Sequence, residues 1–281
     1  MAAPIYSTPF QPYVYQSPQE SVTPFQILGG EAQIVQIMLK SQEKITAKPN
    51  SMCYMSESIK IGSVYPPQHE GGVWQWFFGK NATKIILSNS GQDDGFVGIA
   101  APSLARILPI DLANLGGEIL CQSDAFLCSI NDVTVRNSSQ HRAQNIPDAE
   151  AVLRQRLVGQ GLAFLVGGGS VVQKILVPDE ILVVDVACIL AMTNTIDFKL
   201  KIPNSARRVV SGGNKQPKAF LRGPGIVFIQ SLPFHQFSKS IARAVTSPNM
   251  KEPPRFLFQI IGIFFFFLYV MIVISLIFTD L

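Results

Sequence analysis

The chain has 281 residues, of which 47% are hydrophobic and 15% charged, and its formal net charge is +4. This balance excludes a disordered polar chain, and glycine and proline without a three-residue period exclude collagen. Four cysteines in a chain of this length exclude a disulfide scaffold.

Residues 1–24 are predicted to form an extended, proline-rich arm. The arm contains no lysine or arginine, and the first basic residue is Lys40. An organelle presequence is usually rich in arginine, so we expect no cleaved import signal here. Proline-rich composition favours an extended polyproline conformation. In the alternative, the tyrosines Tyr6, Tyr13 and Tyr15 dock on the folded domain.

Residues 25–234 are predicted to form a β-rich domain. Short apolar runs alternate there with glycine, proline, asparagine and aspartate, which is the pattern of strands and turns. The runs are Ile34–Leu39, Lys84–Leu87, Glu118–Leu120, Phe126–Ile130, Leu162–Val166, Val171–Val177, Ile181–Val186 and Ile226–Gln230. We therefore predict a mainly β fold with a few short helices.

Weak self-similarity indicates internal repeats within this domain. An offset of 137 places Glu43 on Glu180, and an offset of 62 places Glu118 on the same residue and Leu127 on Ile189. Such periods predict stacked repeated β units, arranged as a sandwich or a barrel-like stack. Exposed strand edges in stacked units invite pairing, which leaves a homo-oligomer open.

Two helices are predicted outside this pattern. The Pro-Asp start at Pro147 predicts a helix that continues to Val158. A second, amphipathic helix is predicted from His235 to Val245, within a juxtamembrane segment of residues 235–255. This second helix either packs on the β domain or rests on a lipid surface.

Residues 256–278 are predicted to form a transmembrane helix. The segment contains no Asp, Glu, Lys or Arg, and its 23 residues give roughly 34 Å of helix, enough to cross a hydrocarbon core of about 30 Å. Lys251 and Arg255 precede it, which places the large N-terminal part in the cytosol. We expect a tail-anchored integral membrane protein, in a mitochondrial membrane or, alternatively, in the endoplasmic reticulum or plastid envelope.

Several motifs in order resemble a known family. They are FQILGGE at residues 25–31, VQIML at 35–39, KPNSM at 48–52, GQGLAF at 159–164 and GPGIVFIQS at 223–231. Together they resemble the altered-inheritance-of-mitochondria family of mitochondrial biogenesis proteins, and in particular its tail-anchored plant members. The resemblance implies a β fold like that of the tryptophan RNA-binding attenuation protein, oligomers in bacterial relatives, and no enzyme activity.

The resemblance also implies a role in membrane organisation, because a fungal member supports inner-membrane architecture and respiratory-complex assembly. We expect this chain to depart from an imported inner-membrane pattern, since we expect no presequence at its N-terminus and a membrane anchor at its C-terminus. The fungal role is therefore not carried over in detail. Fold likeness alone does not assign function.

Residue patterns predict no metal, cofactor or catalytic site. The histidines His69, His141 and His235 are far apart, and the four cysteines form no C-x-x-C pair. Ser170 follows three glycines but lacks the spacing of a nucleophile elbow. Phe164 stands where a dinucleotide fingerprint requires its third glycine. We expect a protein that is not an enzyme.

Positive charge is concentrated between residues 199 and 222, where no acidic residue occurs. The seven basic residues are Lys199, Lys201, Arg207, Arg208, Lys215, Lys218 and Arg222. We predict a hairpin that carries a contact surface. It is either simply solvated or it contacts anionic lipid. Nucleic acid is the least favoured partner, because Phe220 is the segment's only aromatic residue for stacking on bases.

The resulting hypothesis is a non-enzymatic, membrane-anchored scaffold or adaptor. Its partners would be membrane lipid, through the C-terminal helix, and proteins that the sequence does not identify. The alternative hypothesis is an RNA-binding module tethered to a membrane.

Overall fold

Three consecutive segments of the chain pair their strands in the same order. The computed structural model describes residues 11–13, 15, 24–64, 84–137, 153–201, 217–245 and 260–271. The chain divides into two units, Met1–Phe234 and His235–Leu281.

Strands dominate the first unit. The first segment contains β3 (Ile34–Leu39), β4 (Lys44–Ala47), β5 (Met52–Met55), β6 (Ile59–Val64), β7 (Lys84–Asn89) and β8 (Gly95–Ala100). The second contains β9 (Ala105–Asp111), β10 (Glu118–Cys121), β11 (Phe126–Ile130), β12 (Val133–Asn137), β13 (Gln155–Gly159) and β14 (Leu162–Gly168). The third contains β15 (Val171–Leu176), β16 (Ile181–Asp185), β17 (Ile189–Thr193), β18 (Asp197–Lys201), β19 (Lys218–Arg222) and β20 (Gly225–Gln230). Two short strands, β1 (Gln11–Pro12) and β2 (Phe25–Leu28), and two 3-10 turns, Ala113–Leu115 and Val186–Cys188, complete the unit.

Each segment forms two three-stranded antiparallel sheets. In the first segment the sheets run β3-β8-β5 and β6-β7-β4, and in the second they run β9-β14-β11 and β12-β13-β10. The third segment repeats the order as β15-β20-β17 and β18-β19-β16. Every predicted apolar run coincides with one of these strands, although the runs that end at Val177 and Val186 each extend one residue too far, so the mainly β prediction is confirmed.

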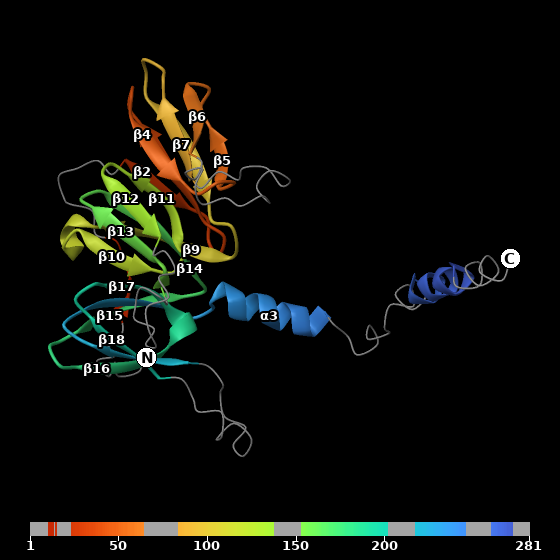
Figure 1. Cartoon of the computed structure of the whole chain (residues 1–281). Coiled ribbons are helices and arrows are strands. Elements are labelled where there is room, and N and C mark those ends of the chain that lie inside the picture. The colour runs from red at the N-terminus through yellow and green to blue at the C-terminus, as the bar shows by residue number, and fades with distance from the viewer. Residues whose placement is uncertain are drawn as a thin grey trace, which may run out of the picture. The chain divides into compact units, whose positions relative to one another are not determined.

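Backbone ladders join the segments into a stack. The second strand of one segment pairs with the third strand of the next, as β4 with β11 and β10 with β17. These joints merge the segment sheets into one six-stranded and one seven-stranded sheet. Within the first unit, β4, β6 and β7 (orange) lie toward one end, and β15, β16 and β18 toward the other (Figure 1).

A β-bulge recurs at the same place in each segment. The register shifts in the third strand at Cys53, Leu127 and Leu190. The spacings are 137 residues (190 − 53) and 63 residues (190 − 127). The first spacing equals the offset predicted from the sequence, and the second corrects the predicted offset of 62 by one residue.

The turn between the first and second strands is also repeated. The carboxylate of Glu43 accepts the backbone N–H of Lys40 at 2.8 Å, and Glu180 accepts that of Val177 at 3.0 Å. The residue before each glutamate has a left-handed backbone, with φ of 67° and 64°. The two acidic turns paired by the sequence are therefore built alike.

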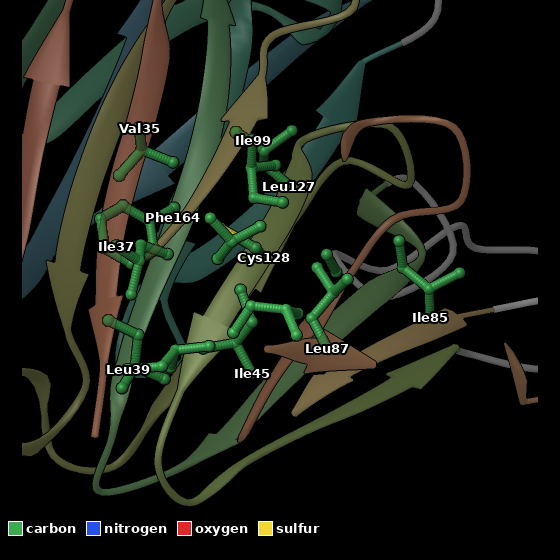
Figure 2. Close-up of a cluster of buried hydrophobic side chains, with 14 of the residues drawn as sticks. Val35, Ile37, Leu39, Ile45, Ile85, Leu87, Ile99, Leu127, Cys128 and Phe164 are labelled. Atoms are coloured by element: carbon green, nitrogen blue, oxygen red, sulfur yellow. The ribbon is translucent and has the colours of Figure 1, made fainter. Parts of the chain in front are cut away.

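The core lies between the sheets of each segment and extends across the joints. Along β3, alternate residues are buried, because successive side chains of a strand point to opposite faces. Figure 2 shows Val35, Ile37 and Leu39 along this strand, with Phe164 and Cys128 from later strands among the same buried side chains. Two further clusters fill the second and third segments.

Two tyrosines of the N-terminal arm dock on the β unit. The ring of Tyr13 packs edge-on against that of Phe228, with ring centroids 5.3 Å apart. The ring centroids of Tyr15 and Phe25 are 5.4 Å apart. Strand β1 pairs with β15. The docking alternative is confirmed for these two tyrosines, whereas Tyr6 lies outside the described residues.

The helix predicted from His235 to Val245 is confirmed as α3 (Phe234–Val245). A second helix covers residues 260–271, inside the predicted span of 256–278, whose other residues lie outside the described part. Among the described residues, no helix has the length and apolar character needed to cross a membrane.

The helix predicted to reach Val158 is wrong at its C-terminal end. Residues 155–159 form strand β13, which pairs with β10 on one side and β12 on the other. These neighbours satisfy the backbone from both sides, and Leu157 is fully buried. The local start signal at Pro147 carries no information about such distant partners; residues 147–152 lie outside the described part.

Candidate functional site

Four of the seven basic residues predicted as a contact surface lie on two neighbouring strands. Lys199 and Lys201 belong to β18, and Lys218 and Arg222 to β19. The two strands pair antiparallel. The turn expected between them, at residues 212–214, lies outside the described residues. The remaining three, Arg207, Arg208 and Lys215, lie outside the described residues.

Strand β16 completes this sheet on the other side of β19, and the register aligns the outward side chains in three rows. Directly opposite residues of antiparallel strands project to the same face. The rows are Ile181, Arg222 and Asp197; Val183, Phe220 and Lys199; and Asp185, Lys218 and Lys201. We call these nine residues the basic face.

Apolar side chains are exposed within the basic face. Ile181 and Val183 are 54% and 49% exposed, and Phe220 lies beside them in the middle strand. Large exposed aliphatic side chains next to an aromatic ring, bordered by cations, form a surface that is neither purely polar nor part of the core. Such rimmed apolar patches are typical of interaction sites.

The cations of the basic face are weakly paired. The ammonium of Lys199 lies 3.4 Å from Asp197, and the guanidinium of Arg222 lies 3.9 Å from Asp179, with all four side chains about half exposed or more. Exposed pairs of this kind contribute only about 0–1 kcal/mol. The ammonium of Lys201 lies 5.8 Å from the ring centroid of Phe220. With four basic and two acidic side chains, the face carries a net charge of +2 (4 − 2).

The opposite side of the same sheet is held in the core. Ala219 and Leu221 of β19 are fully buried, and Val184 of β16 is nearly so. They belong to one cluster with Leu176 and Val227. The alternation of buried and exposed residues along β19 therefore fixes the direction in which its basic side chains point.

The candidates for chemistry do not come together. Among the described residues, no group of three or more His, Cys, Asp or Glu side chains could hold a metal ion. His235 lies on α3, and His69 and His141 lie outside the described part. The N–H of Ser170 donates to the hydroxyl of Ser231, which places this serine in a turn.

The cysteines differ in exposure rather than forming a site. Burial raises the pKa of the Cys121 thiol to about 12 and that of Cys128 further. Both are fully buried, Cys188 is half-buried, and Cys53 is exposed at the bulge of β5. Buried thiols of this kind behave as small hydrophobic side chains.

The sequence missed the apolar part of the basic face. Residues 181–186 form an apolar run, which predicts a strand but does not tell which side of it faces water. Ile181 and Val183 alternate with Leu182 and Val184, and only the second pair points into the core. The pairing with β19, which decides this, is not visible in a run that is apolar on both faces.

Comparisons with known proteins agree on the extent of this fold. The model of the family described as "Mitochondrial biogenesis AIM24" matches residues 25–232. The crystal structure of protein SPYM3_0169 from Streptococcus pyogenes is similar, with a TM-score of 0.60 and 20% sequence identity, over 79% of this chain and 99% of that chain. At this identity the likeness concerns the fold alone. No curated protein matches the chain significantly.

Proposed function

Because this chain belongs to the family described as Mitochondrial biogenesis AIM24, we propose that it is a non-enzymatic scaffold or adaptor in mitochondrial membrane organisation and biogenesis. Residues 256–278 anchor it in the membrane as a C-terminal helix, with the β unit on the cytosolic side. A β surface confined to a membrane meets its protein partners at a raised effective concentration.

The observation that carries the proposal is the basic face. Four exposed cations, of which Lys199 and Arg222 form weak ion pairs, surround the exposed side chains of Ile181 and Val183. Each lysine or arginine close to an anionic membrane contributes about 1 kcal/mol, and apolar side chains can enter the headgroup region. The face thus matches a lipid surface in both charge and apolar character.

Helix α3 is a second element whose exposed side chains suit a membrane surface. Its apolar residues Ile241 and Val245 are 46% and 67% exposed, and Lys239 on the same helix is also exposed. A basic amphipathic helix that precedes an apolar segment is suited to the membrane interface. We propose that α3 lies on the membrane surface.

The anchor is tested by truncation. We expect the full chain to stay with membranes after alkaline extraction, and a chain that ends at Arg255 to appear in the soluble fraction. A localisation of the full chain by fluorescence or fractionation then tests the mitochondrial assignment. Extraction of the full chain at alkaline pH would contradict the anchor.

The basic face is tested on the chain that ends at Arg255, since it retains the whole β unit. Its binding to neutral phosphatidylcholine vesicles is compared with its binding to vesicles that contain cardiolipin. One variant replaces Lys199, Lys201, Lys218 and Arg222 by glutamine. A matched control replaces exposed cations on other strands or turns, namely Lys40, Lys44, Lys60 and Arg136.

At about 1 kcal/mol per cation, the first variant should lose up to about 1,000-fold in affinity for anionic vesicles, and the control much less. Because α3 is present in all three proteins, it does not account for a difference between them. Equal losses in the two variants would contradict the proposal. If the first variant instead loses binding to single-stranded RNA while vesicle binding is unchanged, the RNA-binding alternative replaces it.

A further inference from the structure

The stack of three segments ends in two strand edges that match the strands of its own joints. Inside the chain, a second strand always meets a third strand, as β4 meets β11 and β10 meets β17. The last second strand, β16, pairs only with β19 among the described residues, and the first third strand, β5, pairs only with β8. One end of the stack thus has a second strand with an open edge, and the other end has a third strand with an open edge.

The backbone groups at these edges correspond to those that close the joints. At the first joint the N–H of Lys48 donates to the carbonyl oxygen of Leu127 at 2.8 Å, and at the second Gln122 donates to Leu190 at 3.0 Å. The repeat spacing of 137 carries Lys48 onto Asp185, and the bulge spacing carries Leu127 onto Cys53. The same bond at the open ends would run from the N–H of Asp185 to the carbonyl oxygen of Cys53.

The free groups point outward, as this pairing requires. The N–H of Gly223 donates to the carbonyl oxygen of Glu180 across the β16–β19 ladder, and such bonds recur at every second residue. The N–H groups of Val183 and Asp185 therefore face away from β19. By the same alternation, the bond from Ser56 to Phe96 places the N–H of Met55 on the side away from β8.

The side chains at the joints are buried, whereas the equivalent side chain at the open edge of β5 is exposed. The bulge residues Leu127 and Leu190 are 0% and 1% exposed at the joints, whereas Cys53 at the corresponding place in β5 is exposed. Strand β5 carries no charge and no proline, and β16 carries only Asp185 at its end. Proteins that keep strand edges free usually protect them with lysine or proline, and neither edge has this protection.

We propose that copies of this chain associate head to tail, with β16 of one copy pairing antiparallel to β5 of the next. The register follows from the joints and sets Val184 opposite Tyr54 and Val183 opposite Met55. The occupant of each edge is a second copy, because the chain already forms this pairing twice within itself. The contact is heterologous, so it closes into a ring or continues as a filament.

Disulfide trapping tests the register in the full chain, purified in a mild detergent. The exposed and half-exposed thiols are first removed by Cys53→Ser and Cys188→Ser. One preparation then carries Met55→Cys and the other Val183→Cys, each with a different affinity tag, and the two are mixed and oxidised. Residues that exchange both backbone bonds have Cα atoms about 5.5 Å apart, a distance that a disulfide spans.

We expect a disulfide between the two preparations and none within either. A matched control replaces Val183→Cys by Ile61→Cys on β6, because Ile61 is 47% exposed and Val183 is 49% exposed. Bonds between two copies of Val183→Cys would show a symmetric contact and overturn the proposal. Equal trapping by Ile61→Cys would show random collision and overturn it as well.

A second measurement uses the mass of the full chain by light scattering. We expect multiples of 30.8 kDa for the wild type and a monomer for Val183→Pro. Proline removes the outward N–H of Val183 and leaves the β16–β19 hydrogen bonds in place, so thermal stability of the monomer should change little. A monomeric wild type, or a Val183→Pro variant of unchanged mass, would refute the head-to-tail contact.

Discussion

Replacing Leu127 by alanine tests whether the joints between segments carry the stability of the β unit. Leu127 is fully buried at the bulge of β11, next to the ladder with β4. The change removes three carbon atoms, which at about 0.8 kcal/mol each gives about 2.4 kcal/mol of lost transfer free energy. The cavity adds to this, so we expect a loss of about 2.7–5 kcal/mol.

The equivalent positions in the other two segments provide controls for Leu127→Ala. Leu190 occupies the same place in the third segment and is equally buried, so Leu190→Ala should cost a similar amount. Cys53 is the equivalent of both in the first segment but is exposed, so Cys53→Ala should change the stability of a monomer by less than about 0.5 kcal/mol. Leu127→Met keeps the volume and should cost less than about 1.5 kcal/mol.

Thermal unfolding, followed by circular dichroism, measures these differences. For a unit of this size, 1 kcal/mol corresponds to about 2–4 °C in Tm, so Leu127→Ala should lower Tm by roughly 5–20 °C. The reasoning is refuted if Leu127→Ala leaves Tm unchanged. It is also refuted if Cys53→Ala lowers the Tm of a monomeric sample as far as Leu127→Ala does, since exposure would then not separate joints from ends.

Three further outcomes are expected. The hydrogen bond from Lys174 lowers the pKa of Glu180 below its ordinary 4.5, so the stabilisation is present above pH 4.5 and lost in stronger acid; Glu180→Gln should lower Tm at neutral pH, and the gap from the wild type should close as the pH falls. In the monomeric Val183→Pro variant, alkylation followed by mass spectrometry should label Cys53 first and leave Cys121 unmodified until the chain unfolds, and early labelling of Cys121 would contradict its burial. Gly159→Ala should destabilise the unit or prevent its folding in thermal melts, because φ is +146° and a Cβ would lie 1.9 Å from a backbone carbonyl oxygen; an unchanged Tm would contradict this.

The strand pattern of this chain could be predicted from its sequence because the signal is local. Short apolar runs between turn residues located strands such as β3 and β11 with their observed bounds. The offset of 137 was also readable, since Glu43 and Glu180 are required by the same turn. A turn that recurs in the fold requires the same residue type each time, and this recurrence is visible in the sequence.

Distant pairing could not be predicted. The segment 155–158 has no strand signal strong enough to outweigh the helix start at Pro147, and it becomes a strand because β10 and β12 lie on either side. The basic residues were visible as a cluster, but the exposure of Ile181 depends on the neighbour of β16 across the sheet. Both depend on partners far away in the chain.

The three longest links between strands of the β unit occur at the same position in each segment. They join the fourth strand of a segment to the fifth, and they are residues 65–83, 138–154 and 202–217. Fourth and fifth strands are already paired with each other, so lengthening their link costs only about 0.6 kcal/mol per doubling. A longer link or a link of different charge at one of these positions would therefore leave the ladders intact, and the same three positions are where an inserted reporter or epitope should be tolerated.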